Sequence, residues 1–569
     1  MAETKREIER KYESDDSALP DLTGVAGVAA VLDKGVAELD ATYYDTADER
    51  LAAASLTLRR RTGGSDAGWH LKFPVAPGVR DEIRAPLSDT VPRSLAGLVR
   101  SRVRGAELVP VVRLRSARDV RDLVDGEGRL LAEVSLDAVR ADRLTGRGGS
   151  ARWTEIEVEL ADGGDPAFLD TVEEQLRTAG VRPSASASKL ARALEETRPK
   201  KERRAEKAGK TTKAGKTAKA DKNAKPGKNA KPGKNAKPGK TTKPGKPGKT
   251  AKAGKAAAAV PAGQAGPAVQ SVREPSAVAP LTAGDHVLMY LRAQRDALVE
   301  LDPAVRRDLP DAVHRMRVAT RRARSAFRSF AKVLDRTVTD PIGEELKWLA
   351  GELGVDRDQE VLTERLTAAL EELPRPLVTG PVRNRLRTWS RARGGGSRRR
   401  LLAVLDGSRY LALLDTLDRL VDDPPLLEAA AGEPSKVIAK AVRKDFGQVA
   451  ALVEEALGRP PGTERDVALH EARKKAKRTR YSAEAAAPAL GEPAVGLVRM
   501  MKSLQSLLGD HQDSVMTREA LCDLAAQAHA AGESAFTYGL LYGREERRAE
   551  LAEAALPEAW ATVSGAMEV

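Results

Sequence analysis

A lysine-rich tract in the middle of the chain divides the sequence into two parts that must fold separately. The hexapeptide Lys-Asn-Ala-Lys-Pro-Gly occurs three times in succession from Lys222, and a lysine stands at every third position from Lys207 to Lys255. Because lysine repulsion and repeated Pro-Gly prevent a packed core, residues 198–275 are predicted to form a disordered, extended linker. The 569-residue chain is therefore expected to hold a strand domain at residues 1–197 and a helical domain at residues 276–565.

The same tract explains the net charge of the chain. Between Pro199 and Val260 there are 21 Lys and Arg residues and three acidic ones, which gives +18, whereas the whole chain carries +14. The rest of the chain is therefore close to neutral. The tract is either a solvated spacer or a polycation that binds a polyanion, such as nucleic acid, by releasing counterions. Because it lacks aromatic residues, we expect no base readout.

Residues 1–197 alternate between apolar and charged side chains with a period of two, which is typical of strands. Gly, Pro and Asp separate the alternating segments, and helical stretches are expected near residues 21–38 and 165–179. This pattern predicts an α+β domain built on an antiparallel sheet or barrel. The segments include Glu7 to Lys11, Leu56 to Arg61, Trp69 to Lys72, Val111 to Arg115 and Glu155 to Leu160.

The charges on these strands are sorted by sign. Residues i, i+2 and i+4 of a strand share one face, so some faces are acidic and others are basic. A single charged face is usually a solvent face, but a solvent face would mix signs to avoid repulsion. Divalent Mg²⁺ or Mn²⁺ would relieve the acidic faces, and the basic faces would hold phosphates. The sorted faces are Glu7-x-Glu9-x-Lys11, Glu155-x-Glu157-x-Glu159, Arg59-x-Arg61 and Arg113-x-Arg115.

The same residues resemble the CYTH domain, the triphosphate tunnel metalloenzymes. Glu7-x-Glu9-x-Lys11 matches the family's ExExK signature, and further matching pieces follow in the family's order across nearly all of residues 1–195. These pieces are Tyr43-Tyr44-Asp45-Thr46, Leu58-Arg59-x-Arg61, Leu71-Lys72-x-Pro74, Arg80-x-Glu82, Arg113-x-Arg115, Asp137, Glu155-x-Glu157-x-Glu159 and Ser188-Lys189.

The resemblance implies an eight-stranded antiparallel tunnel that binds Mg²⁺ or Mn²⁺ and a phosphate chain. Family members hydrolyse inorganic triphosphate, thiamine triphosphate or RNA 5′-triphosphate ends, and some cyclise ATP. It implies Glu7, Glu9, Glu157 and Glu159 as metal ligands. Lys11 is a further catalytic candidate, and either Glu155 or Glu159 could accept the proton of the attacking water. The implied phosphate-binding residues are Lys11, Arg59, Arg61, Lys72, Arg80, Arg113, Arg115 and Lys189.

Residues 280–565 are rich in Ala, Leu, Arg and Glu at helical spacing and contain an internal repeat. His314-x-x-Arg317-x-x-x-Arg321-Arg322-x-Arg324 is matched by His470-x-x-Arg473-x-x-x-Lys477-Arg478-x-Arg480. Each copy is followed by a second matched segment, from Lys347 to Asp358 and from Lys502 to Asp513. The repeat predicts two similar helical bundles that face one another.

On a helix, each His-Arg segment forms a basic stripe beside an apolar stripe that begins at Val313 and Met316. Such a stripe is usually a solvated face, but here it repels itself and occurs twice, which favours an anion-binding groove. The pattern resembles the CHAD domain, which implies two four-helix bundles and a groove for inorganic polyphosphate. The candidate groove residues are His314, Arg317, Arg321, Arg322, Arg324, Lys347, His470, Arg473, Lys477, Arg478, Arg480 and Lys502.

Three hypotheses follow for the whole chain. The first is a metal-dependent triphosphatase or polyphosphatase that the helical domain recruits to polyphosphate or its granules, and the second is a non-catalytic polyphosphate scaffold. The third is nucleic-acid binding through the lysine tract. A single cysteine, Cys522, and the absence of an apolar leader or a membrane-length apolar run favour a cytoplasmic location.

Overall fold

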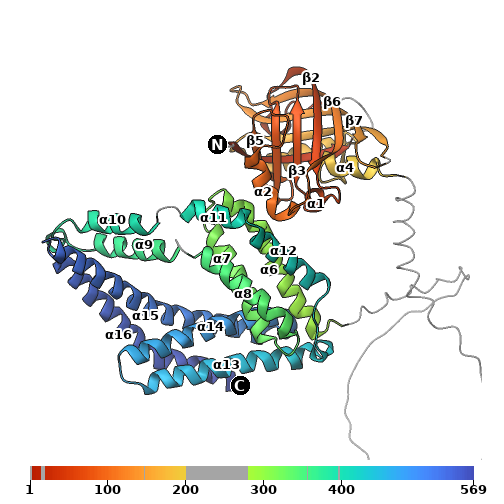
Figure 1. Cartoon of the computed structure of the whole chain (residues 1–569). Coiled ribbons are helices and arrows are strands. Elements are labelled where there is room, and N and C mark those ends of the chain that lie inside the picture. The colour runs from red at the N-terminus through yellow and green to blue at the C-terminus, as the bar shows by residue number, and fades with distance from the viewer. Residues whose placement is uncertain are drawn as a thin grey trace, which may run out of the picture. The chain divides into compact units, whose positions relative to one another are not determined.

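The computed structural model describes residues 3–13, 19–146, 148–199, 280–354, 357–394 and 397–568. The lysine-rich tract that is predicted to be a linker lies outside these residues. The strand domain and the helical domain, both drawn in Figure 1, are treated separately below.

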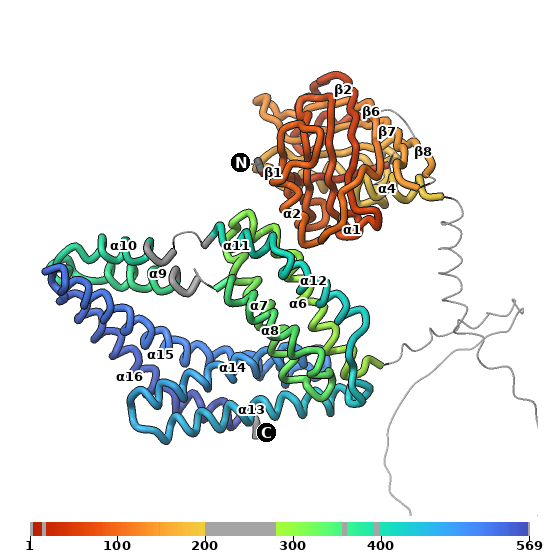
Figure 2. The backbone as a smooth tube through the Cα atoms, in the orientation of Figure 1, coloured from red at the N-terminus to blue at the C-terminus, as the bar shows by residue number. Residues whose placement is uncertain are grey.

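The strand domain is a closed antiparallel barrel. Its sheet has the strand order β5-β4-β3-β2-β6-β7-β8-β1, and β1 also pairs with β5, so eight strands form a ring with the short β9 at its edge. The backbone trace in Figure 2 follows this ring. The predicted eight-stranded barrel is thereby confirmed. The strands are β1 (Glu3–Glu13), β2 (Ala30–Asp45), β3 (Thr57–Thr62), β4 (Gly68–Ala76), β5 (Val79–Ala85), β6 (Val109–Val124), β7 (Leu130–Arg143), β8 (Ser150–Leu160) and β9 (Arg182–Pro183).

Helices cover the apolar outer faces of the strands, so the alternating charged side chains point into the barrel. On β8, Ile156 and Val158 are fully buried in a cluster that includes Leu169 and Val172 of helix α3 (Ala167–Thr178). Helix α2 (Arg93–Val103) covers β3, β4 and β5 in the same way. Helix α4 (Lys189–Glu196), which starts at the N-cap Ser188, instead packs against apolar residues on the inward-facing side of β6, β7 and β8, such as Leu114, Val139 and Trp153, while α1 (Arg50–Ala53) is a single turn.

One expected element of the strand domain is wrong. The helix expected near residues 21–38 is instead the short 3-10 turn Val25–Gly27 followed by β2. Gly24, Gly27 and Gly35 all have φ between 81° and 85°, a left-handed conformation that interrupts an α-helix. The helix expected near residues 165–179 is confirmed as α3.

The helical domain contains two rings of four helices, which confirms the predicted pair of bundles. Helices α6, α7, α8 and α12 contact one another in a closed ring, and so do α13, α14, α15 and α16. Helices α7 and α14, which carry the two His-Arg segments, pack against each other. The bounds are α6 (Ala283–Arg306), α7 (Ala312–Ser329), α8 (Arg336–Glu352), α9 (Arg357–Glu371), α10 (Val382–Gly394), α11 (Ser397–Asp406), α12 (Ser408–Asp422), α13 (Pro434–Gly458), α14 (Thr463–Leu490), α15 (Glu492–Ala530) and α16 (Phe536–Glu568).

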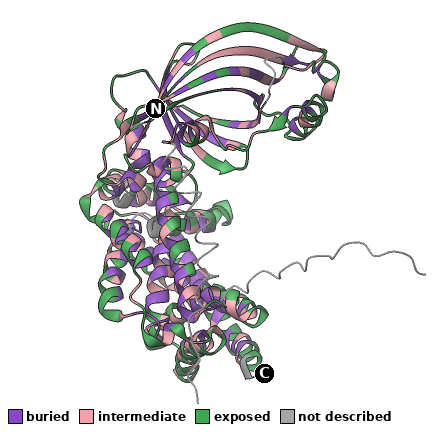
Figure 3. Ribbon diagram, turned by 90° about the vertical axis from the view of Figure 1, so that its right-hand side faces the viewer, coloured by how far each residue is buried: buried purple, intermediate pink, exposed green. Residues whose placement is uncertain are grey.

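The apolar stripe of α7 lies in the core as the helical spacing predicts. Met316, Thr320, Ala323 and Phe327 are almost fully buried, and Val313 packs at the edge of the same core. One continuous hydrophobic cluster joins the two bundles. Figure 3 shows the buried residues in purple along these helices. Among the described residues, no helix is both long and apolar enough to cross a membrane.

Candidate functional site

The barrel encloses a cavity of about 600 Å³ whose walls are rich in charged side chains of both signs. The first strand contributes Lys5, Glu7, Glu9 and Lys11, which confirms that this face of β1 points inward. The other charged lining residues are Lys34, Arg59, Arg61, Asp66, Lys72, Arg80, Glu82, Arg84, Arg118, Glu133, Glu157, Glu159, Asp162 and Lys189. The interior is therefore suited to a ligand that carries both anionic groups and bound cations.

A row of glutamates crosses three neighbouring strands of the cavity wall. Glu9 on β1 lies opposite Glu159 on β8, and Glu159 lies opposite Glu133 on β7. Burial raises the pKa of Glu133, and Glu159 raises it further. Burial also raises the pKa of Glu7, with Glu82 and Glu159 acting in the same direction and Lys72 opposing them. Like charges directly opposite one another destabilise a sheet, so this acidic row favours a bound cation.

The acidic row has the donor set that Mg²⁺ or Mn²⁺ prefers. Glu7, Glu9 and Glu159 offer carboxylate oxygens to the cavity, and the sequence did not single out the fourth member, Glu133. Lysines neutralise part of the row: Lys72 donates to Glu7 at 2.5 Å and Lys5 to Glu159 at 2.6 Å. The residues present therefore fit a divalent ion. The lysines neutralise part of the negative charge on these carboxylates.

A second acidic group lies beside the row and is already neutralised by cations. Asp137, Glu155 and Glu157 lie close enough together to hold a metal, but the ammonium of Lys189 is 3.0, 2.6 and 2.6 Å from them. Burial opposes the charge on Lys189, yet Asp137 and Glu155 raise its pKa well above the ordinary value. This group is consequently an internal ion network rather than an open metal site.

The network changes the interpretation of two predicted residues. Both oxygens of Glu157 are engaged, one by Lys11 and the other by Arg118 and Lys189, so Glu157 is less available to a metal than Glu7, Glu9 and Glu159. Glu155 accepts a hydrogen bond from the Trp153 indole at 2.6 Å, and it is absent from the cavity lining. Of the two predicted proton acceptors, Glu155 is therefore the one already engaged by Trp153 and Lys189.

The basic wall contains two buried guanidiniums that lack full hydrogen bonding. The Nε atoms of Arg59 and Arg61 are buried and have no hydrogen-bond partner, although Arg61 forms an ion pair with Asp66. Burial, and then the nearby Arg59 and Arg118, lower the pKa of Arg61 to about 9. An anion placed between these arginines would relieve both the repulsion and the missing hydrogen bonds.

Two predicted phosphate ligands lie outside the barrel. The strand register pairs Arg115 with Asp40 and Arg113 with Thr42, and both arginines are exposed. Arg113 donates to Asp40 at 2.8 Å and Arg115 to Asp142 at 2.6 Å. The neighbouring Leu114 is buried, so the alternation of β6 turns these arginines to the outer surface. The prediction that they hold phosphate in the tunnel is wrong.

Arg118 occupies the interior position on β6 that the sequence did not identify. It donates to Asp137 at 2.7 Å and to Glu157 at 2.8 Å. Burial opposes its charge, but Asp137 and Glu157 raise its pKa well above the ordinary value. Arg118 lies on the same face of β6 as Leu114 and Ser116, because side chains alternate along a strand. This alternation is the sequence pattern that could have identified Arg118. The two faces of β6 both carry arginine, so charge alone could not show which face is interior.

In the helical domain, the two matched segments of each repeat meet through an arginine and a glycine. A Cβ atom on Gly354 would lie 2.8 Å from the Arg317 guanidinium, and a Cβ on Gly509 would lie 3.4 Å from that of Arg473. Arg317 and Gly354 occupy the same repeat positions as Arg473 and Gly509. The repeated glycine therefore gives the repeated arginine room to lie against the following helix.

Basic residues of both repeats converge on Lys477. Burial, and then Arg473 and Arg321, lower the pKa of Lys477 to about 8, although Asp513 opposes the shift. Arg321 belongs to α7, whereas Lys477 and Arg473 belong to α14, so the two His-Arg segments contribute to one basic cluster. Arg480 also adds to this positive potential. Such a cluster is electrostatically prepared for a polyanion.

Other candidate groove residues have carboxylate partners or lie on exposed surface. Arg322 donates to Glu484 at 2.8 Å, and Arg478 bonds to the buried Asp445, so both tie helices together. Arg324, whose pKa is lowered by burial and then by Arg328, is half-buried on α7. Burial and then Lys474 lower the pKa of His470. The candidates at exposed positions are His314, Lys347 and Lys502.

Comparisons with known proteins agree with this two-part architecture. A CYTH domain matches residues 5–194 and a CHAD domain matches residues 289–522. Uncharacterized proteins from two strains of Mycobacterium tuberculosis, CDC 1551 / Oshkosh and ATCC 25618 / H37Rv, are each 36% identical over 97% of this chain and 95% of their own length.

Two solved structures resemble parts of the chain. PptA from Streptomyces chartreusis is 23% identical, covers 49% of this chain and 99% of its own, and has a TM-score of 0.43. The CHAD domain from Ricinus communis is 20% identical, covers 51% of this chain and 95% of its own, and has a TM-score of 0.40.

Proposed function

Because the chain belongs to the family of proteins that join a CYTH domain to a CHAD domain, we propose that its tunnel hydrolyses inorganic triphosphate or a related oligophosphate or polyphosphate with Mg²⁺ or Mn²⁺. The observation that carries the proposal is the buried pair Arg59 and Arg61 facing an acidic row across one cavity. A phosphate chain would accept the hydrogen bonds that the buried Nε atoms of the two arginines do not make, and its metal ions would relieve the repulsion between neighbouring glutamates.

The lining residues have different roles according to the wall of the cavity on which they lie. Arg59, Arg61 and Lys72 hold the phosphate oxygens, and Arg80 and Lys11 extend this contact along the cavity. Glu7, Glu9 and Glu159 hold the metal, with Glu133 beside them. When bound, the metal neutralises charge on the terminal phosphoryl group and lowers the pKa of a coordinated water.

Proton transfer falls to a carboxylate that lines the cavity. Of the two predicted acceptors, Glu159 lines it and Glu155 does not. Lys189 and Arg118 hold Asp137 and Glu157 ionised and so fix the charge next to the phosphate site. Arg84, which pairs with Glu82, also lines the cavity and adds positive charge to the same wall.

Phosphate release by the full chain from triphosphate with Mg²⁺ or Mn²⁺ tests the proposal. The double variant Glu7→Gln plus Glu9→Gln should lose at least about a hundredfold in turnover, because it removes metal ligands. Arg113→Gln plus Arg115→Gln is a matched control, since both arginines lie outside the barrel. Equal release by the wild type and the glutamate variant would show that the tunnel is a non-catalytic binding site.

For the helical domain, we propose that the basic cluster around Lys477 binds inorganic polyphosphate. The supporting observation is the convergence of Arg321, Arg473 and Lys477 from both repeats. Arg321→Gln plus Lys477→Gln should weaken binding of long-chain polyphosphate to the full chain. Lys436→Gln plus Arg499→Gln removes the same charge from exposed positions and should have little effect. Equal weakening by both double variants would contradict a defined groove.

A further inference from the structure

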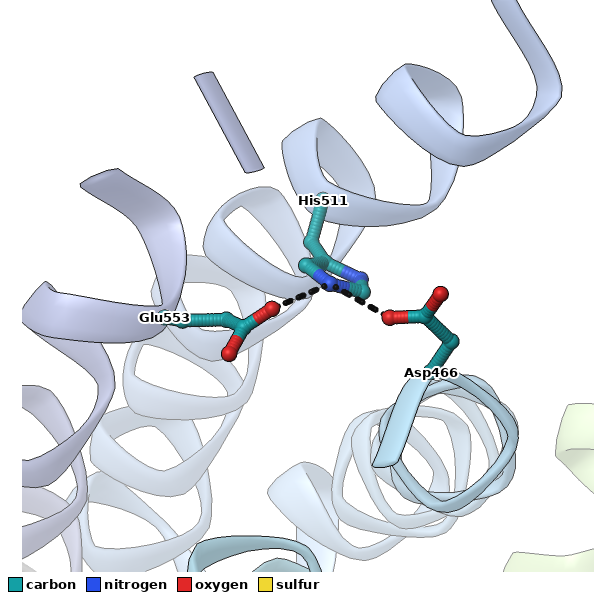
Figure 4. Close-up of side chains that lie close together, drawn as sticks. All are labelled: Asp466, His511 and Glu553. Carbon is teal, nitrogen blue, oxygen red and sulfur yellow. Dashed lines mark hydrogen bonds and ion pairs between the residues drawn. The ribbon is translucent and has the colours of Figure 1, made fainter. Parts of the chain in front are cut away.

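Three helices of the second bundle bring an imidazole and two carboxylates together, and none of these three residues belongs to the basic cluster just described. His511 lies on α15, Asp466 on α14 and Glu553 on α16, and Figure 4 shows the imidazole between the two carboxylates. The Nε2 atom of His511 is 3.2 Å from Asp466 Oδ1 and 3.2 Å from Glu553 Oε1. His511 is only 2% exposed, whereas the carboxylates are partly accessible.

Hydrogen bonding alone leaves this arrangement incompletely satisfied. Nε2 carries at most one proton but faces two carboxylate oxygens at the same distance, so one N–H cannot serve both well. The other ring nitrogen, Nδ1, is buried and has no hydrogen-bond partner. A metal ion coordinated by nitrogen and oxygen at about 2.1 Å would separate its ligand atoms by about 3.0 to 3.4 Å. The two N–O separations fall in that range, and all three ligand atoms lie within 4.8 Å of one another.

Each carboxylate directs its second oxygen to an arginine. Glu553 Oε2 is 3.2 Å from Arg465 Nε, and Asp466 Oδ2 is 4.0 Å from Arg518. Both carboxylates therefore present one oxygen to the imidazole, and the other oxygen lies in the field of an arginine, close for Glu553 and at the limit of an ion pair for Asp466. Charged outer partners of this kind can orient the ligands of a metal.

We propose that Asp466, His511 and Glu553 form a site for a divalent first-row transition-metal ion of the zinc type. An imidazole ligand favours such ions over Mg²⁺ and Ca²⁺, which prefer oxygen donors alone. A bound ion would clamp α14, α15 and α16 at one point. The site belongs to the second repeat alone, because Pro310 and Asp356 stand at the sequence positions that match Asp466 and His511. It is therefore not part of the repeated phosphate-binding pattern.

Zinc binding by the full chain tests the proposal. After metal removal and reloading with Zn²⁺, the metal content is measured together with the dissociation constant. His511→Gln is compared with His529→Gln, which changes an exposed histidine on the same helix and leaves the tunnel carboxylates intact. We expect His511→Gln to lose one equivalent of zinc, or to bind it at least about tenfold more weakly, and His529→Gln to match the wild type.

Two further variants guard against loss of folding at the buried histidine. Asp466→Asn and Glu553→Gln change partly accessible side chains with little change of shape, and each should weaken zinc binding while the metal-free melting temperature stays close to that of the wild type. Zinc should also raise the melting temperature of the wild type more than that of these variants. Equal zinc content in the wild type and all three site variants would overturn the proposal and leave the cluster as a hydrogen-bonded network.

Discussion

The tunnel and the helical groove handle positive charge in opposite ways. In the tunnel, Lys11, Lys72 and Lys189 each lie within 3.0 Å of a carboxylate, so acids and bases neutralise one another inside a closed barrel. In the groove, Lys477 is surrounded mainly by other cations, and its pKa is lowered to about 8 by burial and then by Arg473 and Arg321. Lysines in the tunnel are therefore closely paired with carboxylates, whereas Lys477 in the helical domain lies mainly among other positive charges.

The difference follows from the two scaffolds. A closed barrel turns one face of every strand toward the same interior, and a sheet of like charges there would be very costly, so acidic and basic strands must share it. Two packed helices can place their basic stripes at a surface where water limits the repulsion. The tunnel is thus suited to a phosphate chain that arrives with metal ions, and the groove to a long polyanion bound by charge alone.

The largest expected difference between the tunnel and the basic cluster is in how strongly ligand binding depends on salt concentration. Raising NaCl from about 50 to 500 mM should weaken long-chain polyphosphate binding by a hundredfold or more, because counterion release dominates the binding of a polyanion to a basic cluster. The KM of the tunnel for triphosphate should change less than tenfold, since its cations are enclosed. Binding is measured on the Glu7→Gln plus Glu9→Gln variant, so that hydrolysis does not interfere.

A parallel titration removes the contribution of the lysine tract. A variant that lacks residues 207–255 should show a smaller salt slope for polyphosphate, yet its slope should remain steeper than that of KM in the tunnel. Similar salt dependence at both sites would break the comparison, because it would mean that the tunnel also binds its ligand mainly through screened charge.

Replacing the interior Arg118 should lower activity far more than replacing Arg113, which lies on the outer face of the same strand. Arg118→Gln removes a cation that touches Asp137 and Glu157, so we expect kcat/KM for triphosphate to fall about a hundredfold. Arg113→Gln should stay within twofold of the wild type. The melting temperature of each variant is measured as a control, and Arg118→Lys should recover part of the activity. Equal effects of Arg113→Gln and Arg118→Gln would contradict the strand register.

Alternation predicted an antiparallel sheet or barrel, the internal repeat predicted the paired bundles, and the resemblance to the CYTH domain implied the closed eight-stranded tunnel. Sequence reasoning failed where both faces of a strand carry the same charge. On β6, Arg113 and Arg115 share one face and Arg118 the other, and only pairing with β2 decides which is inside. Glu133 was missed for a similar reason, since a single glutamate on β7 becomes significant only opposite Glu159.

The helical domain shows a second limit of sequence reasoning. The spacing of the basic stripe was visible, but the partners of its members come from other helices. Arg322 and Arg478 are taken up by Glu484 and Asp445, so they belong to the packing of the bundles. His511 is not among the site residues that the sequence identifies. Its carboxylate partners lie on α14 and α16, tens of residues away.

The smallest expected effect tests the positive potential around Lys477 directly. The pKa of Lys477 is about 8 in the folded protein against an ordinary value of 10.5, so the unfolded chain binds more protons between these two values. The free energy of unfolding should therefore rise with pH across this window. Bound polyphosphate stabilises the protonated lysine, so polyphosphate affinity should instead fall, by several-fold, as the pH rises through about 8.

The two opposite trends distinguish Lys477 from any general effect of pH. Lys477→Met should remove the rise in stability and flatten the fall in affinity, whereas Lys436→Met, at an exposed position, should leave both trends in place. Urea unfolding and polyphosphate binding are measured on the same samples at each pH. If affinity and stability moved in the same direction in the wild type, or if Lys477→Met behaved like Lys436→Met, the lysine would not lie in a mainly positive field. The contrast between the groove and the neutralised tunnel would then fail.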